Sequence, residues 1–288
     1  MSAGQPGGGS IVRRMLLGAQ LRRLRESRGI TREDAGYSIR ASESKISRME
    51  LGRVSFKERD VADLLTLYGV TEEDERLAML GLVREANAAG WWHGYGEVMP
   101  TWFQTYVGLE ESAALIRTFE VQFVHGLLQT EDYIRQVIRL GHPDAADPWV
   151  ERRVGLRLER QKLLVSERAP HFVAVMDEGA LRRPFGTRQG MRDQIAHILE
   201  AADAPNVEVR VLPFAIGGHA AGGGAFTLLS FPESDLPDLV YLEQLTGALY
   251  IDKHDEVVEY DKAMTTLGRI ALSPADSLDW LAELQREL

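Results

Sequence analysis

Residues 16–51 read LLGAQLRRLRESRGITREDAGYSIRASESKISRMEL, and this stretch decides the fold of the N-terminal part of the chain. Leu17, Leu21 and Leu24 recur at the spacing of one helix face. Gly29 follows them, and glycine commonly ends a helix. The start of the stretch therefore predicts an amphipathic helix that stops at Gly29.

Two shorter helices are expected after this glycine. Thr31 is a favourable N-cap for the first, a tight turn follows near Arg40, and Ser42 is a favourable N-cap for the second. Ile46 and Met49 are expected to face the core. Two helices joined by a tight turn form the helix-turn-helix layout, in which the second helix enters the major groove of DNA.

The residues expected to bind DNA gather in and around this second helix. Its N-terminal end faces the groove in this layout, so Ser44, Lys45 and Arg48 are the best candidates for contact. Glu43 could accept a hydrogen bond from a cytosine amino group or simply favour the positive end of the helix. The alternative is a structural three-helix unit with solvated charges. The complete expected set is Arg13, Arg14, Arg32, Ser42, Glu43, Ser44, Lys45, Arg48 and Arg53.

The charge of the chain is unevenly divided. The whole sequence has a net charge of −10, yet residues 11–53 contain eleven basic and five acidic residues and carry +6. The remainder carries −16. A basic N-terminal domain attached to an acidic body fits a single nucleic-acid face, because phosphate attracts the former and repels the latter.

The glycine-rich residues 1–10 are expected to form a disordered arm, and they have neither the charged nor the apolar region of a secretion signal. Arg13 and Arg14 follow directly. Two interpretations stay open for these arginines. They could start a solvated helix, or they could belong to an arm that touches phosphate or the minor groove.

The segment GITREDAGYSIRASESKISRMELGR, residues 29–53, resembles the Xre family of repressor-like helix-turn-helix domains. The resemblance implies that Arg32, the first residue of its helix, touches phosphate. It also implies that Arg25 forms a structural ion pair with Glu50, which does not read DNA.

Residues 11–80 are predicted to form the DNA-binding domain, closed by a helix over 56–68 and followed by a helix that Thr71 caps. A linker or hinge is expected at 81–105. This segment holds Trp91, Trp92 and Trp102, which could form an aromatic ligand box with His93 or dock a hinge into the core of the second domain.

Residues 106–288 are predicted to form a larger α+β domain with a mixed or antiparallel sheet. Its longest helix is expected to start at an Asp147 cap, and the arginines of this helix could be solvated or offer a second DNA contact. Caps are also expected at Thr130 and Ser273. Gly217 to Gly224 lacks the residues of a phosphate loop and predicts a mobile strand connection or a lid. The five apolar runs expected as strands are HFVAVMDEGAL, NVEVRVLPF, AFTLLSFP, DLVYLEQL and ALYID.

The second domain carries a resemblance of its own. The segments FEVQFVHGLLQTEDYIRQV, LRLERQKLL, DEGALRRPFG, VRVLPF, GAFTLLSFP and LVYLE are similar to the C-terminal domain of actinobacterial regulators with an Xre-type N-terminal domain. The resemblance implies an antitoxin-like transcription regulator whose partner is a small protein encoded by an adjacent gene. His125 departs from the family, which usually has proline there. The region expected to meet a partner or ligand comprises Trp91, Trp92, Trp102, His125 and Gly222.

Several classes of protein are not expected. The chain has no cysteine, no apolar run long enough to span a bilayer and no recognisable catalytic or metal-binding motif, so neither an enzyme nor a cofactor or metal site is predicted. The sequence predicts a cytoplasmic, sequence-specific DNA-binding regulator, associated with the nucleoid when bound, whose homodimer reads half-sites about 34 Å apart. A small protein partner is the expected regulatory input. The alternatives are a small-molecule effector or, less favoured, an enzyme with a DNA-targeting domain.

Overall fold

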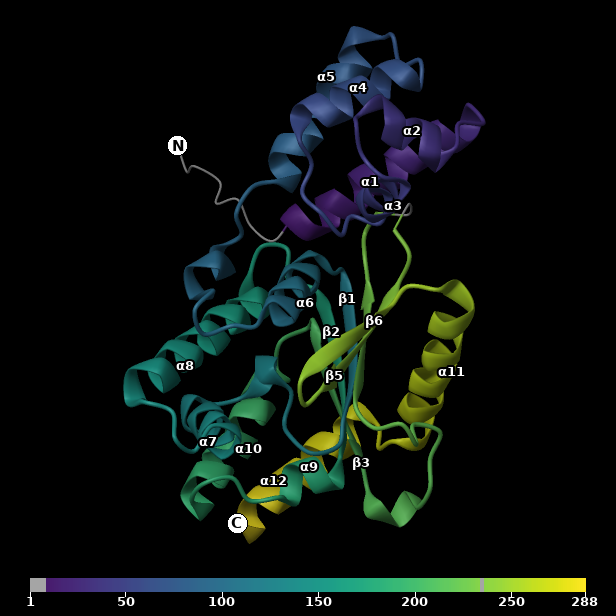
Figure 1. The fold of residues 1–288 in the computed structure, drawn as a ribbon. Coiled ribbons are helices and arrows are strands. Elements are labelled where there is room, and N and C mark those ends of the chain that lie inside the picture. The colour runs from purple at the N-terminus through teal and green to yellow at the C-terminus, as the bar shows by residue number, and fades with distance from the viewer. Residues whose placement is uncertain (1–8, 234–235) are drawn as a thin grey trace. The chain divides into compact units, whose positions relative to one another are not determined.

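The structure, a computed structural model, describes residues 9–233 and 236–288, which form two compact units (Figure 1). Among these residues, the N-terminal unit comprises 9–94, 104–112, 233 and 236, and the C-terminal unit comprises the rest. Most of the arm expected at residues 1–10 lies outside the described residues. Residues 9 and 10 begin the first helix, so the expectation of disorder does not hold for them.

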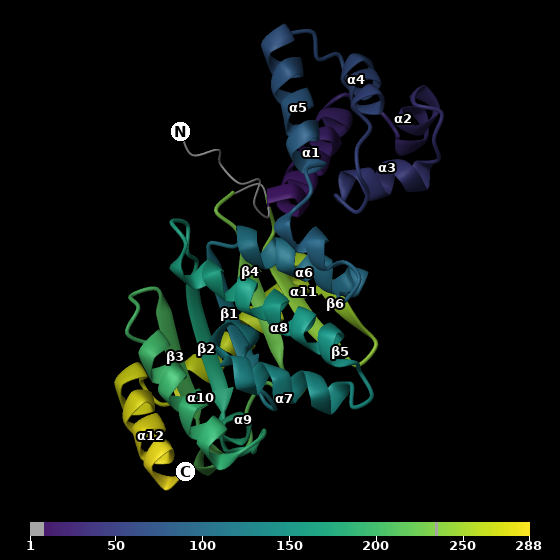
Figure 2. The ribbon, with the colours of Figure 1, turned by 90° about the vertical axis from the view of Figure 1, so that its left-hand side faces the viewer.

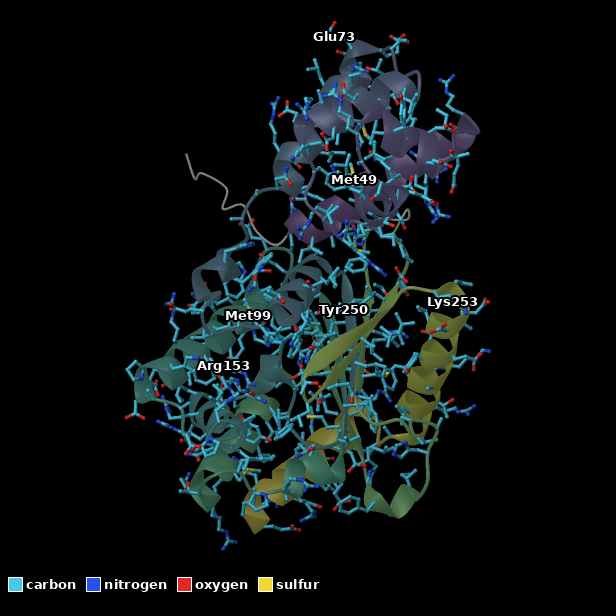
Figure 3. The ribbon with its side chains drawn as sticks, viewed as in Figure 1. Met49, Glu73, Met99, Arg153, Tyr250 and Lys253 are labelled. Carbon is cyan, nitrogen blue, oxygen red and sulfur yellow. The ribbon has the colours of Figure 1, made fainter. Side chains whose placement is uncertain are left out.

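Packed helices make up the N-terminal unit. Its core contains the fully buried side chains of Leu17, Leu21, Met49 and Leu64, and Figure 3 labels Met49 among these helices. The helices are α1 (Gly9–Ser27), α2 (Arg32–Ser38), α3 (Glu43–Glu50), α4 (Glu58–Leu67), α5 (Glu73–Ala86), the 3-10 helix η1 (Trp91–Tyr95), which ends at the unit boundary, and the later part of α6 (Thr101–Ser112).

Most of the expected helix caps are present. Thr31 and Ser42 cap α2 and α3, and each side chain accepts a hydrogen bond from a backbone N–H in the first turn. Thr130 and Ser273 do the same in the C-terminal unit. The prediction for Thr71 was wrong, because α5 starts one residue later at a Glu72 cap and has three acidic residues in its first turn. Asp147 likewise lies inside its helix, after an Ala146 cap.

A six-stranded mixed sheet forms the centre of the C-terminal unit, with the order β3-β2-β1-β4-β5-β6. Strands β1, β2 and β3 are parallel, and β4, β5 and β6 are antiparallel to their neighbours. All five expected strands are present, and the sixth comes from the segment after α6. The strands are β1 (Leu115–Glu120), β2 (His171–Asp177), β3 (Val207–Leu212), β4 (Phe226–Ser230), β5 (Leu239–Gln244) and β6 (Gly247–Ile251).

Helices cover both faces of this sheet (Figures 1 and 2). On one face, Phe119, Leu228 and Val240 pack against Met264 and Leu267 of α11. Helices α7, α8 and α10 lie on the other face, and α12 packs against β3 and α10. The remaining elements are η2 (Gly126–Leu128), α7 (Glu131–Gly141), α8 (Asp147–Gln161), η3 (Lys162–Val165), α9 (Glu178–Arg182), α10 (Arg188–Ala201), η4 (Phe214–Ile216), α11 (His254–Ile270) and α12 (Pro274–Glu287).

Within the described part of the chain, no helix is both long and apolar enough to cross a bilayer.

Candidate nucleic-acid interface

The turn between α2 and α3 has a backbone that few residues tolerate. Arg40 adopts a left-handed φ of 55°, and the Ala41 N–H donates to the Gly36 carbonyl over 2.8 Å. A Cβ on Gly36 would lie 2.8 Å from the Ala41 carbonyl oxygen, so only glycine lets the turn fold back this closely. The turn fixes the direction in which α3 leaves α2.

A second close approach holds α3 against α1. A Cβ on Gly18 would lie 2.6 Å from the Glu50 carbonyl oxygen, inside the distance that real side chains keep. The backbones of the two helices therefore meet at Gly18. Ile46 and Met49 are buried on the same side of α3, which leaves the opposite side free of packing.

Glu50 is the centre of a buried ion network that ties the three helices together. Its carboxylate accepts from Arg25 Nε over 2.5 Å and Arg25 NH2 over 3.2 Å. Arg32 Nε donates to the same carboxylate over 3.0 Å, and Arg25 NH1 donates to the Ile30 carbonyl. The hydrogen bond with Glu50 raises the pKa of Arg25 above its ordinary value. The pair implied by the resemblance is thus present, and Arg32, proposed as a phosphate contact, also belongs to it.

Lys45 is also held within the unit. Its Nζ lies 2.6 Å from Oδ2 of Asp60 on α4, and the Asp60 side chain is only 4% exposed. Local sequence patterns do not indicate this pair, because the two residues are fifteen positions apart. Lys45 can reach DNA only if it leaves Asp60 or binds phosphate while still paired.

The exposed end of α3 presents a small polar group of side chains. Glu43, Ser44 and Arg48 are exposed, and Ser42 uses its hydroxyl to cap the helix. Arg40 in the turn and Arg53 beyond α3 are exposed and form no ion pair within residues 9–233 and 236–288. Nine residues were expected to contact DNA. Among them, Arg48 and Arg53 carry exposed guanidinium groups that form no ion pair within the described residues.

Tyr37 was missed in the sequence, although it is 87% exposed on α2. Ala35 and Ile39 are buried at a spacing of four residues, which places Tyr37 between them on the outer side of the helix. Helical periodicity alone could have found it. A large exposed aromatic ring beside the turn adds a group that can contact sugar, phosphate or a base methyl group.

Arg13 and Arg14 lie in the first turns of α1, so the interpretation as an extended arm was wrong. Arg13 NH1 forms an ion pair with Glu85 of α5 at 2.5 Å. Arg14 is half-buried, and burial lowers its pKa. The two adjacent arginines therefore have different surroundings.

The five residues expected to meet a partner or ligand differ in their exposure. Trp92 is 1% exposed and packs at Gly108 within the N-terminal unit. His125 is 6% exposed, caps η2 and lies against the Phe172 ring, where it cannot directly meet a partner. Trp91 and Trp102 are half-buried, and Gly222 is exposed between β3 and β4.

A buried polar network joins α8 to the segment between β1 and α7 in the C-terminal unit. Arg157 NH1 donates to Gln129 Oε1 over 3.1 Å, and Gln129 Nε2 donates to the Val124 carbonyl over 2.7 Å. Burial, together with the neighbouring charges of Arg160 and Arg153, lowers the pKa of Arg157 to about 10. Arg160 is 5% exposed and lies over the Phe103 ring. These two arginines are therefore not the solvated or DNA-facing row expected on this helix, whereas Arg152 is exposed.

Glu120 ends β1 in the same region. It accepts a hydrogen bond from the Thr118 hydroxyl over 2.9 Å, and Thr118 in turn accepts from Thr227 over 3.2 Å. Burial raises the pKa of Glu120 to about 8, and the nearby carboxylate of Glu243 contributes in the same direction. Glu120 is therefore mostly protonated at neutral pH. Burial also raises the pKa of Tyr133 to about 12.

No cluster of three or more histidine and acidic side chains within the described residues could hold a metal ion. The helices of the N-terminal unit form a helix-turn-helix domain, a type that suggests a DNA-binding regulator. The family comparison agrees, because residues 16–79 match a helix-turn-helix domain. Residues 103–283 match the domain of unknown function DUF5753, and the chain belongs to this family. No curated protein and no solved structure matched the chain.

Proposed function

We propose that this chain is a sequence-specific transcription regulator that binds operator DNA as a homodimer in the cytoplasm. The exposed N-terminal end of α3 carries the proposal, because its polar side chains stand free while Gly18, Gly36 and Glu50 fix the helix behind them. Ser44 and Arg48 would contact base edges, and Arg53 would contact phosphate. Two such helices in a dimer would read half-sites about 34 Å apart.

An operator selected from random duplexes provides the test, followed by titration with variants. Arg48→Ala is expected to weaken binding by about 1–3 kcal/mol and to relax the preference at one base position. Arg84→Ala removes an exposed arginine that pairs with Glu58 on the other helices and serves as the control of equal charge. If Arg48→Ala and Arg84→Ala bind the operator equally well at several salt concentrations, the assignment of α3 fails.

For the C-terminal unit we propose a small protein as the regulatory partner, with a small-molecule effector as the alternative. Phe214 is 60% and Ile216 is 40% exposed beside the glycine-rich connection, and exposed apolar side chains favour a protein contact. A pocket of about 220 Å³ beside β3, lined by His171, Glu208 and Pro274 among others, is smaller than the 300 Å³ or more typical of ligand sites. No catalytic role is assigned.

Operator titration with and without the small protein encoded by an adjacent gene would test this input. The partner is expected to change operator affinity for the wild type and to lose its effect on a Phe214→Ser, Ile216→Ser variant. If the partner binds the wild type and the double variant equally well, Phe214 and Ile216 are not part of its binding surface. A chain that responds only to low-molecular-weight cell extract would favour the small-molecule alternative.

A further inference from the structure

The N-terminal unit contains a polar pocket that the proposed DNA contacts do not use. Its volume is about 240 Å³, and its walls come from α1, the loop after α3, the end of α5 and η1. The lining residues are Arg14, Ser55, Phe56, Ala86, Asn87, Ala88 and His93. The lining contains a cation and several neutral polar groups, but no carboxylate.

Arg14 supplies the unusual feature of this pocket. Its guanidinium forms no ion pair within the described residues, and its Nε is buried there without a hydrogen-bond partner. Nε is closed to solvent, so the terminal NH groups are the part of Arg14 that a ligand in the pocket would meet. A buried N–H of a charged group without an acceptor is costly, so native structures normally provide one. Arg13, the preceding residue, forms an ion pair with the carboxylate of Glu85. Within the described residues, Arg14 therefore lacks the carboxylate partner that its neighbour has.

The other polar groups of the pocket are arranged around this cation. The Asn87 side chain forms two hydrogen bonds with the Phe56 backbone: Nδ2 donates to the carbonyl over 2.6 Å, and Oδ1 accepts from the N–H over 3.2 Å. Asn87 therefore has a structural role in the pocket wall. The Ser55 hydroxyl has no partner within the described residues. His93 Nδ1 lies 3.0 Å from the Gly90 carbonyl, which leaves Nε2 as a donor when the ring is protonated.

We propose that this pocket binds a phosphate group, with Arg14 as the principal ligand and Ser55 and His93 as supporting donors. An arginine that lacks an acceptor matches the planar, charge-assisted recognition of oxyanions. The pocket joins α1, the loop behind α3 and the end of α5, so an anion there would brace the base of the DNA-binding helices. The phosphate could belong to a free small molecule or to the DNA backbone, since both offer the same oxyanion.

Titration of the full-length protein with inorganic phosphate tests the site without DNA. Phosphate at constant ionic strength, balanced with chloride, should raise the unfolding temperature of the wild type in a saturable manner. Arg14→Gln should weaken the apparent affinity by about tenfold or more, as expected for loss of a charge-assisted pair. Arg13→Gln is the matched control and should respond like the wild type.

Ser55→Ala provides a second variant, because it removes a donor without disturbing a buried charge. It is expected to weaken phosphate binding by a smaller factor. Equal stabilisation of the wild type, Arg13→Gln and Arg14→Gln would show an ionic effect and overturn the site. The absence of any saturable stabilisation of the wild type would overturn it as well.

Salt dependence of duplex binding distinguishes the two sources of phosphate. If the ligand is the DNA backbone, Arg14→Gln should reduce the slope of log affinity against log salt by about one, and inorganic phosphate should compete with the duplex. If the ligand is a free molecule, the slope should stay unchanged and phosphate should bind to the DNA complex. The phosphate titration does not involve DNA, so a failure of the proposed regulator function would leave its result intact.

Discussion

Two buried networks of the chain, one around Glu50 and one around Glu120 and Arg157, treat charge in opposite ways. In the N-terminal unit, Glu50 is paired with two arginines and Asp60 with Lys45. In the C-terminal unit, Glu120 and Arg157 form no ion pair within the described residues, and burial moves the pKa of each toward its neutral form. In the closed N-terminal network each buried carboxylate has a cationic partner, and these pairs fix the positions of the helices. In the open C-terminal network Glu120 and Arg157 have no oppositely charged partner within the described residues. Shifted pKa values of this kind are common at sites that respond to a ligand or to pH.

Glu50→Gln is expected to have the largest effect, because it breaks the closed network. Arg25 is 8% exposed at its side chain and would lose its buried carboxylate, which typically costs about 3–5 kcal/mol. Hydrogen exchange should show loss of protection over residues 16–51 in particular. Glu58→Gln, an exposed carboxylate that pairs with Arg84 and lies outside the Glu50 network, is the control. Equal protection in the two variants would show that the network does not hold the helices.

Glu120→Gln tests the open network through its pH dependence. The pKa of Glu120 is about 8 in the folded state and close to its ordinary value of 4.5 when unfolded. Below about pH 4.5 both states are protonated and the group has no effect. As the pH rises toward 8, only the unfolded state ionises, so Glu120 progressively reduces the stability of the wild type.

Glutamine keeps an oxygen for the Thr118 hydroxyl but cannot ionise. The variant should therefore be more stable than the wild type by about 3 kcal/mol at pH 7, and the difference should nearly vanish near pH 4.5, since each pH unit between the two pKa values corresponds to about 1.4 kcal/mol. Unfolding temperatures across this range give the measurement. Glu243→Gln, an exposed neighbour, should show little change. A difference that is constant with pH would contradict the raised pKa.

Local sequence patterns predicted much of the fold. Leucine periodicity, the Thr31 and Ser42 caps and the five β-rich runs depend on nearby residues, and each is confirmed. The α+β class with a mixed sheet followed from the order of these elements. The cap of α5 was misplaced by one residue because Thr71 is followed directly by several acidic residues. The cap of α8 was misplaced because Asp147, the favourable capping residue there, lies inside the helix after Ala146.

The candidate sites depend on contacts that sequence spacing does not show. The sequence predicts a free cation at Lys45, but its ammonium group pairs with Asp60. The sequence also allows a solvated Arg157, but its guanidinium donates to Gln129. Helical periodicity places Tyr37 on the outer side of α2, but the predicted contacts were chosen mainly among basic and small polar residues, so Tyr37 was not included. The DNA contacts and the homodimer stay predictions.

Asp60→Asn probes the second closed pair and should have an intermediate effect. Lys45 is 31% exposed at its side chain and can turn toward water when its carboxylate is removed, so a loss of about 1 kcal/mol is expected. Lys45 would then be free to contact DNA, so the affinity for the operator should stay equal or increase. Lys45→Met, which removes the cation itself, is the comparison. Weaker DNA binding by Asp60→Asn in a fully folded protein would show that Lys45 acts in its paired position.

Arg40→Gly should have the smallest effect, and it acts on backbone strain instead of charge pairing. Arg40 has a φ of 55°, a conformation that glycine adopts without strain. Stability should rise by about 0.5 kcal/mol relative to Arg40→Ala, since alanine keeps the strain and both variants lose the same charge. If Arg40 contacts phosphate, both variants should also reduce the salt slope of operator binding by about one. The pair thus separates the two roles of this residue. Equal stability of the glycine and alanine variants would mean that the turn relaxes around its side chain, and the close fit of Gly36 to Ala41 would then be the main constraint on α3.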